Sequence, residues 1–290
     1  MTTTNQNKNK LIGTKGFNRR EQEVGAHSIS YLVYNEKKKV RNTFVLSHGA
    51  ACTSFTMQPL ANELKKKYPT DRIIVIDVPW HGQSTSTESI TGKNVIDYSV
   101  IVNEFLSTLI KEEKIVGKLT WLGWSMGGSL GLLADKGGIP IDNLVLLCSS
   151  PYWATLSAMT EATPALLDAN SSVDVWEAVI LSEVANLDKK HVDVFKENIQ
   201  IFLSKPEVAV NDLKVLGPEF YDLRESLSQI NAETFIFGGS QDFLANVELQ
   251  NLLYTGIPKS HLEIFDDSHG LILKPKRIES IIKSLKSSIK

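Results

Sequence analysis

Short apolar runs alternate with longer amphipathic stretches along most of the chain. Seven runs read as strands, namely residues 27–35, 42–49, 71–79, 118–124, 142–150, 232–240 and 260–268. The first alternates between polar and apolar positions, whereas most of the others are continuous in Val, Ile and Leu. Continuous apolar runs with small or polar ends are typical of parallel strands that are buried on both faces. The pattern therefore predicts a mostly parallel sheet.

Between these runs lie segments whose apolar residues repeat at helical spacing. Residues 57–67 and 94–112 have this pattern, and residues 277–289 place Ile278, Ile281, Ile282 and Leu285 on one face. Alternating strands and helices imply right-handed crossovers and an open twisted sheet. We therefore expect an α/β fold with helices flanking the sheet.

One long interval breaks this alternation. Residues 151–230 contain no convincing strand pattern, and residues 174–187 are strongly helical. The interval is too long for a simple crossover, so we expect a helical cap inserted late in the chain and folded over the edge of the sheet. The predicted division is a flexible N-terminal segment (1–25), a core (26–150 and 231–290) and the cap insertion (151–230).

Composition narrows the class of protein. A chain of 290 residues that is 42% hydrophobic can bury a sizeable core, and its formal net charge of −2 gives no reason to expect a nucleic-acid partner. The polar N-terminus lacks the apolar stretch of a signal peptide, and no segment is long enough for a membrane span. We therefore expect a cytoplasmic protein that neither binds nor crosses a membrane; its oligomeric state is open.

Only two cysteines are present, so a disulfide framework is excluded. Cys148 lies in an apolar run and reads as a small buried hydrophobe, whereas Cys52 is placed where it can line a pocket. Neither cysteine has metal-ligand spacing with histidines, so no structural zinc site is expected.

Reactive residue types follow three of the predicted strands. Ser125 follows residues 118–124, Asp242 follows the apolar part of residues 232–240, and His269 follows residues 260–268. Ligands bind at the carboxyl ends of strands in open α/β sheets, so these side chains are expected at one edge. A nucleophile, an acid and a base thus occur in the order Ser, Asp, His.

Five sequence segments resemble those of the α/β-hydrolase family, in the same order. In chain order they are LSHGA (46–50), DVPWHGQS (77–84), GWSMGG (123–128), GGSQDFL (238–244) and DDSHG (266–270). GWSMGG matches the G-x-S-x-G nucleophile elbow, in which a serine follows a strand and opens a helix. The resemblance covers the chain from about residue 28 onward, and implies a cap-bearing serine hydrolase similar to small carboxylesterases.

The resemblance also implies roles for the three residues. Ser125 would be the nucleophile, His269 the base that takes its proton, and Asp242 the acid that orients the imidazole. Asp266 and Asp267 are closer to His269 in sequence and compete for the acid's role, but the family's chain order favours Asp242. The alternative is that Ser125 is an ordinary turn serine.

The remaining site assignments are less direct. The backbone amides of Met126 and Ala50 would form the oxyanion hole, with Ala51 as the alternative second donor. Trp153, Met159 and Ala51 are candidates for contact with substrate, although packing within the cap is the simpler role for the first two. This chemistry needs no metal, nucleotide or flavin, and the expected partner is a small acyl substrate.

Trp80 departs from the family pattern, because it stands where glycine is usual. Either the loop is rebuilt, which we favour, or the indole forms a wall of the pocket. The expected reaction is hydrolysis of carboxylic esters. Alternatives are a lactonase, a thioesterase, a hydrolase of carbon–carbon bonds, an acyltransferase, and a receptor that uses the same fold without catalysis.

Overall fold

One sheet of nine strands organises the described part of the chain. The computed structural model describes residues 15–153, 159–216 and 220–286. The strands are β1 (Phe17–Val24), β2 (His27–Tyr34), β3 (Asn42–Ser47), β4 (Arg72–Ile76), β5 (Thr85–Ser86), β6 (Lys118–Trp124), β7 (Asn143–Leu147), β8 (Glu233–Gly239) and β9 (Ser260–Phe265). Their order is β1-β2-β4-β3-β6-β7-β8-β9, with β5 paired to β2, and all pairs from β4 to β9 are parallel. The predicted mostly parallel α/β fold is confirmed.

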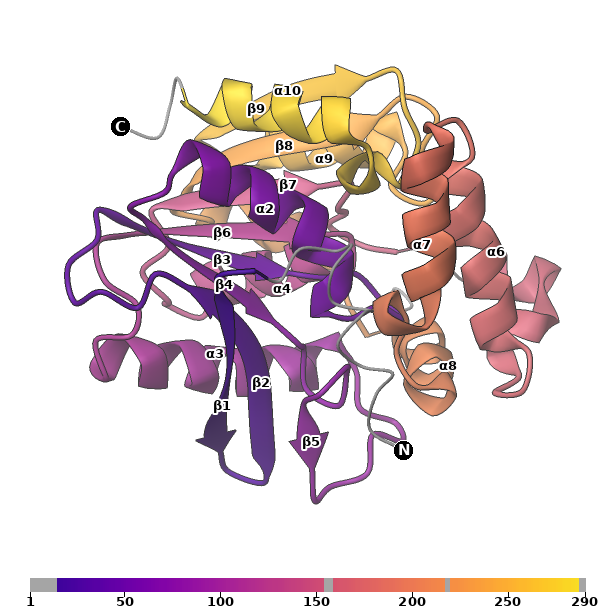
Figure 1. The fold of residues 1–290 in the computed structure, drawn as a ribbon, viewed down its shortest axis with the longest axis horizontal. Coiled ribbons are helices and arrows are strands. Elements are labelled where there is room, and N and C mark those ends of the chain that lie inside the picture. Colours follow the sequence, from indigo (N-terminus) through magenta and orange to yellow (C-terminus); the bar gives the residue numbers. More distant parts are fainter. Residues whose placement is uncertain (1–14, 154–158, 217–219, 287–290) are drawn as a thin grey trace.

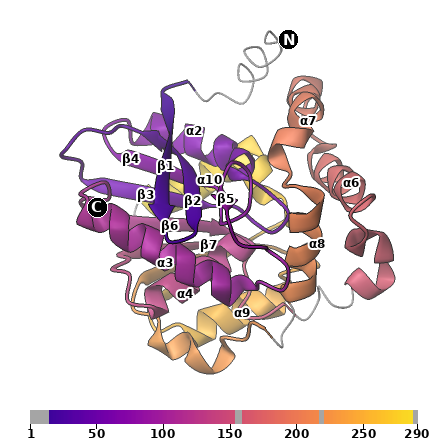
Figure 2. The same cartoon turned by 90° about the horizontal axis from the view of Figure 1, so that it is seen from below.

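Helices cover both faces of the sheet (Figures 1 and 2). On one side are α3 (Val95–Lys111), α4 (Met126–Lys136) and α9 (Val247–Gly256), and on the other α2 (Gln58–Lys67) and α10 (Pro275–Lys286). Strand residues alternate between the two cores: in β4, Ile74 and Ile76 pack with α3 and α4, whereas Ile73 and Val75 pack with α2 and α10. Burial on both faces explains why the central strands read as continuous apolar runs.

The N-terminal prediction was wrong over residues 17–24. This stretch is strand β1, paired antiparallel with β2 along its whole length, and residues 1–14 lie outside the described residues. Only Phe17 and Val24 at its two ends are buried. The segment between them, NRREQE, is polar because β1 is an edge strand. The stretch therefore has no alternation of apolar and polar residues from which the strand could be predicted.

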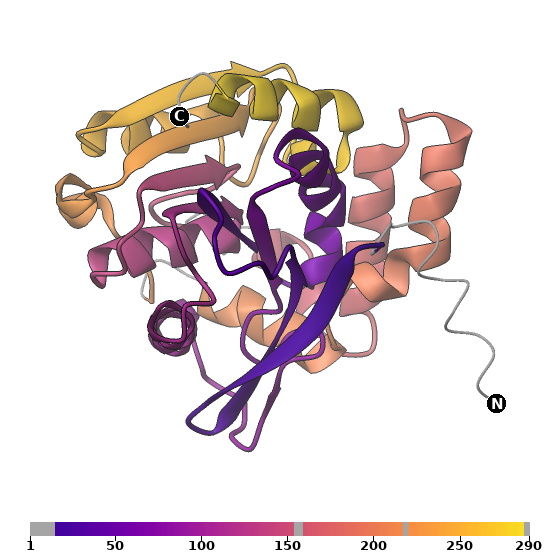
Figure 3. The ribbon, with the colours of Figure 1, turned by 60° about the vertical axis from the view of Figure 1, so that its left-hand side comes forward.

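The chain between β7 and β8 lies for the most part beyond the carboxyl ends of the parallel strands (Figures 1 and 3), and its last helical turn returns to the opposite end of the sheet, against α9. It contains η2 (Pro164–Leu167), α6 (Ser172–Val184), α7 (Lys189–Phe202), α8 (Pro206–Val215) and η3 (Arg224–Gln229). Asp188 caps α7 by accepting the His191 amide, and Pro206 opens α8, where a missing N–H costs nothing. We call residues 151–230 the cap segment. Across the described ranges, no helix has the length and apolar character needed to cross a bilayer.

Candidate active site

Ser125 occupies a strained turn between β6 and α4. Its backbone has φ 55° and ψ −122°, a conformation that side chains rarely adopt outside functional sites. Its amide donates to the carbonyl of Leu147 at 2.9 Å, and its carbonyl accepts from the Gly128 amide at 2.9 Å and the Ser149 hydroxyl at 3.0 Å. The turn is thus tied to both β7 and α4.

The glycines on either side of Ser125 are required by close backbone contacts. A Cβ atom on Gly123 would lie 2.2 Å from the carbonyl oxygen of Gly127, and one on Gly127 would lie 2.3 Å from that of Ser47. Backbone cannot move aside as the end of a flexible side chain can. These glycines therefore allow the turn that presents the Ser125 side chain.

The structure pairs His269 with Asp242, not with Asp266 or Asp267. Nδ1 of His269 lies 2.8 Å from Oδ2 of Asp242. The other oxygen of Asp242 accepts the amides of Leu244 and Ala245, each at 2.9 Å. Burial alone would raise the pKa of Asp242, but the charge and hydrogen bond of His269 outweigh it and lower the pKa below its ordinary value. The carboxylate is thus held ionised.

Trp124 brings this pair beside Ser125. Its indole N–H donates to the carbonyl of His269 at 2.9 Å, and the two rings lie 5.4 Å apart. Trp124 therefore packs beneath the turn and fixes the histidine backbone. Within the described contacts, the Ser125 hydroxyl and His269 make no hydrogen bond. Nucleophile–base pairs commonly close to hydrogen-bond distance only when substrate is bound.

The loop after β3 also lies close to Ser125. A Cβ atom on Gly49 would lie 3.0 Å from Cβ of Ser125. Ala51 has φ 58°, and its amide donates to Oδ2 of Asp212 in the cap segment at 2.8 Å. For the amides of Ala50 and Met126, the described residues provide no hydrogen-bond acceptor. These two amides are therefore free for an oxygen atom of a ligand.

Trp80 fits neither of the two alternatives that the sequence offered. Its backbone keeps a left-handed conformation with φ 67°, so the loop retains the conformation that usually calls for glycine. Its side chain is buried, lies 4.8 Å from the ring of His27 and 5.6 Å from that of Tyr98, and donates to the carbonyl of Glu88 at 2.9 Å. Trp80 is a packing residue, and the prediction of a rebuilt loop was wrong.

The candidate substrate contacts in the cap segment are packing positions. Trp153 is fully buried, and its indole donates to the Ser129 hydroxyl at 3.1 Å. Met159 is half-buried and packs against the same core as α3 and α4. Cys52 is also buried, pairs with Leu203 in an isolated bridge, and has a pKa raised by burial to about 12.

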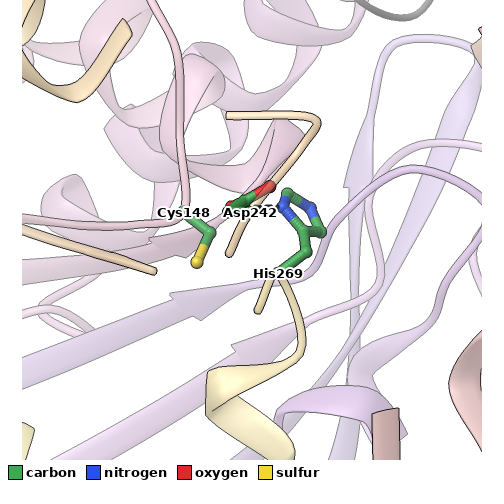
Figure 4. A group of neighbouring side chains, drawn as sticks. All are labelled: Cys148, Asp242 and His269. Atoms are coloured by element: carbon green, nitrogen blue, oxygen red, sulfur yellow. Dashed lines mark hydrogen bonds and ion pairs between the residues drawn. The ribbon is translucent and has the colours of Figure 1, made fainter. Parts of the chain in front are cut away.

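Cys148 lies next to Asp242 and His269, a position that the sequence did not predict. Its thiol lies against Asp242 and His269 (Figure 4), with one ligand atom from each residue within 4.8 Å of the others. Burial raises the pKa of the thiol well above its ordinary value, and the charge of Asp242 adds to this effect. A metal would require a thiolate and a free Nδ1, so these three residues do not suit one in this arrangement.

The loop that carries His269 is held by ion pairs. Asp267 accepts from Lys274 at 2.5 Å and from Arg277 at 2.7 Å. Glu183 in α6 accepts from the Ser268 hydroxyl and from the Gly270 amide, the latter at 3.3 Å. Thus Asp267 has a structural role in the core, and a cap carboxylate contacts both neighbours of His269.

Asp267→Asn is expected to lower the free energy of unfolding by about 2 kcal/mol at neutral pH. Burial alone would raise the pKa of Asp267, but hydrogen bonds from Lys274 and Arg277 outweigh it and hold the pKa below 3.8. The carboxylate therefore stabilises the fold above pH 3.8, and this contribution is lost as the pH falls through its depressed folded-state pKa. Urea titrations from about pH 7 to about pH 3 measure the difference.

The exposed neighbour Asp266 supplies the control for this prediction. Asp266→Asn removes the same charge but leaves the pairs with Lys274 and Arg277 intact, so it should change stability much less. A difference between wild type and Asp267→Asn that stays constant down to acidic pH would contradict the assignment.

Comparison of the sequence with known proteins identifies the family of this chain. The sequence model of the alpha/beta hydrolase fold matches residues 42–274. The chain therefore belongs to the alpha/beta hydrolase fold family, as the five motif segments predicted.

Individual relatives are more distant. A pimeloyl-[acyl-carrier protein] methyl ester esterase of Hamiltonella defensa is 25% identical over 240 residues, which is 78% of this chain and 84% of that protein. The enol-lactonase of Burkholderia xenovorans superposes with a TM-score of 0.76 at 16% identity, covering 92% of this chain and 98% of its own. An esterase of Exiguobacterium antarcticum gives a TM-score of 0.73 at 20% identity, with 92% and 98% covered. The two solved structures establish the shared fold.

Proposed function

We propose that this protein is a serine hydrolase of carboxylic esters with small or medium acyl groups. The observation that carries the proposal is the 2.8 Å contact between Asp242 and Nδ1 of His269, beside the strained turn at Ser125. An ionised carboxylate can only accept a hydrogen bond, so Nδ1 must carry a proton. Nε2 of the neutral imidazole is then left unprotonated, as a general base requires.

The reaction follows from these positions. His269 takes the proton of the Ser125 hydroxyl as its oxygen attacks the ester carbonyl. The tetrahedral intermediate collapses to an acyl-enzyme, and the alcohol leaves with the proton from His269. Water then repeats the sequence, with His269 accepting its proton and returning it to Ser125, and releases the carboxylic acid. Asp242 stays ionised and stabilises the imidazolium formed in each half.

The developing oxyanion would be bound by the amides of Met126 and Ala50. Met126 begins α4, where the first N–H groups have no partner within the helix and the helix dipole favours negative charge. Ala50 is preferred over Ala51 because the Ala51 amide is already engaged by Asp212. Removal of one such donor typically costs about 3 kcal/mol of transition-state stabilisation.

The choice of esters rests on the relatives. The curated relative from Hamiltonella defensa is named a methyl ester esterase. The acyl-enzyme route needs nothing beyond this chain, its substrate and water, so it applies to a carboxylic ester without a cofactor.

A panel of p-nitrophenyl esters from acetyl to octanoyl, together with methyl esters of the same acids, tests the proposal. We expect many turnovers per protein molecule, with acid and alcohol released in equal amounts. Binding of the esters without turnover would favour a receptor on the same fold. Transfer of the acyl group to added alcohols, in preference to water, would favour an acyltransferase.

A further inference from the structure

A carboxylate of the cap segment reaches into the core next to the proposed oxyanion loop. Asp212 in α8 is fully buried. Its Oδ2 accepts the Ala51 amide at 2.8 Å and lies 2.8 Å from Nε2 of His81, while its Oδ1 accepts the Tyr98 hydroxyl at 2.9 Å. One side chain of the cap segment thus holds the loop after β3, the loop after β4, and α3.

His81 is the counter-ion of Asp212. Its Nδ1 lies 2.9 Å from the carbonyl oxygen of Pro79, and its Nε2 faces the carboxylate. Both partners can only accept, so both ring nitrogens must donate and the imidazole is charged. Burial lowers the pKa of His81, but the charge and hydrogen bond of Asp212 outweigh it and raise the pKa. Asp77 acts in the same direction.

The neighbouring His48 is neutral, so the positive charge that faces Asp212 is that of His81. The Val78 amide donates to Nε2 of His48 at 3.1 Å, so this nitrogen carries no proton. Its Nδ1 donates to the carbonyl of Gly49 at 2.8 Å. Burial and the charge of His81, whose ring is 5.1 Å away, lower the pKa of His48 to about 3.

The cap segment holds both backbone groups of Ala51. The N–H donates to Asp212, and the carbonyl accepts the Ser204 amide at 3.0 Å. Ser204 also donates its hydroxyl to the carbonyl of Cys52 at 2.6 Å. Ala51 adopts φ 58°, a left-handed conformation that is unfavourable for alanine, so this turn needs support from outside the loop. The cap segment supplies that support, one residue from the Ala50 amide.

We propose that Asp212 is a positioning residue that shapes the oxyanion loop from the cap segment. The catalytic site is therefore complete only when the cap segment is docked on the core. This inference rests on the proposed function for its kinetic consequence, but the geometry of the loop is independent of it. Asp212 touches no reacting atom, and acts through the Ala51 peptide on the direction of the Ala50 amide.

Asp212→Ala and Asp212→Asn, compared with Glu207→Gln, test the inference. Glu207 is an exposed acid on the same helix. With p-nitrophenyl butyrate, Asp212→Ala should lose about 100-fold in kcat with KM changed less than about threefold. In Asp212→Asn the side-chain amide oxygen would still accept the Ala51 N–H, so this variant should lose only about tenfold. Glu207→Gln should match the wild type.

Hydrogen–deuterium exchange of residues 48–53 gives a second readout that needs no enzymatic activity. Faster exchange in this loop is expected in Asp212→Ala, and to a smaller degree in Asp212→Asn, with the strands of the sheet protected as in the wild type. Asp212→Asn serves alone if Asp212→Ala does not fold, because it retains an acceptor for Ala51.

The two readouts separate failure of the inference from failure of the proposed function. If Asp212 variants melt at a lower temperature but keep wild-type kcat and loop exchange, Asp212 is merely structural and the inference is overturned. If the wild type hydrolyses no ester, the proposed function fails. Faster loop exchange in the variants would then still support the positioning role, and unchanged exchange would reject it.

Discussion

Ser125→Ala is expected to reduce ester hydrolysis by at least about 10⁴-fold, the largest loss among single substitutions in this chain. Alanine removes the oxygen that forms the acyl bond, while the proposed oxyanion donors remain and give only residual catalysis. Steady-state rates with p-nitrophenyl butyrate measure the loss. The backbone conformation of Ser125, with φ 55°, is unfavourable for serine and alanine alike, so the free energy of unfolding should change little.

Ser182→Ala is the matched control, because Ser182 is an exposed serine on α6. It should retain the wild-type rate. If Ser125→Ala kept more than about a tenth of the wild-type kcat while remaining folded, Ser125 would be a turn residue and the nucleophile would lie elsewhere.

Asp242→Asn is expected to lower kcat by about 10⁴-fold, with a small change in KM. The carboxylate accepts from Nδ1 of His269 at 2.8 Å, which keeps Nε2 free to take the serine proton. An amide NH₂ group in the same place donates to Nδ1 and forces the proton onto Nε2. Its other atom, an amide oxygen, still accepts the amides of Leu244 and Ala245, so the loop should stay folded.

Glu248→Gln removes one negative charge at an exposed position on α9, near Asp242 in the chain, and should leave kcat unchanged. Near-wild-type turnover in Asp242→Asn would point to another acid for His269. Asp266 and Asp267 would be the first to examine, although Asp267 is already paired with Lys274 and Arg277.

The sequence predicts the central strands to within about three residues, and the reason is burial. Strands such as β3 and β4 are covered on both faces, so their inner positions, residues 44–46 and 73–76, are all apolar and the run is visible without tertiary information. β1 was missed for the opposite reason, since its polar residues face solvent at the sheet edge. Helix α4 contains Gly127, Gly128 and Gly131, yet the run after Ser125 still indicated a helix, and the family motif supported that prediction.

For the candidate site, chain order and strand ends suggested Ser125, Asp242 and His269, and the structure brings Asp242 and His269 into hydrogen-bond contact. Asp212 had no signal of this kind. It lies in an ordinary helical stretch, and its partners Ala51, His81 and Tyr98 come from three distant segments. Only the packing of the cap segment on the core determines that contact, which no local pattern encodes.

Intact-mass labelling with a fluorophosphonate probe tests the central claim most directly. The probe reacts covalently only with a hydroxyl that an adjacent base activates. The account predicts rapid addition of one label to the wild type, located at Ser125 by peptide mapping, with no addition to Ser125→Ala and very slow addition to His269→Ala. A folded wild type that takes up no label, or a label located on another residue, would contradict it.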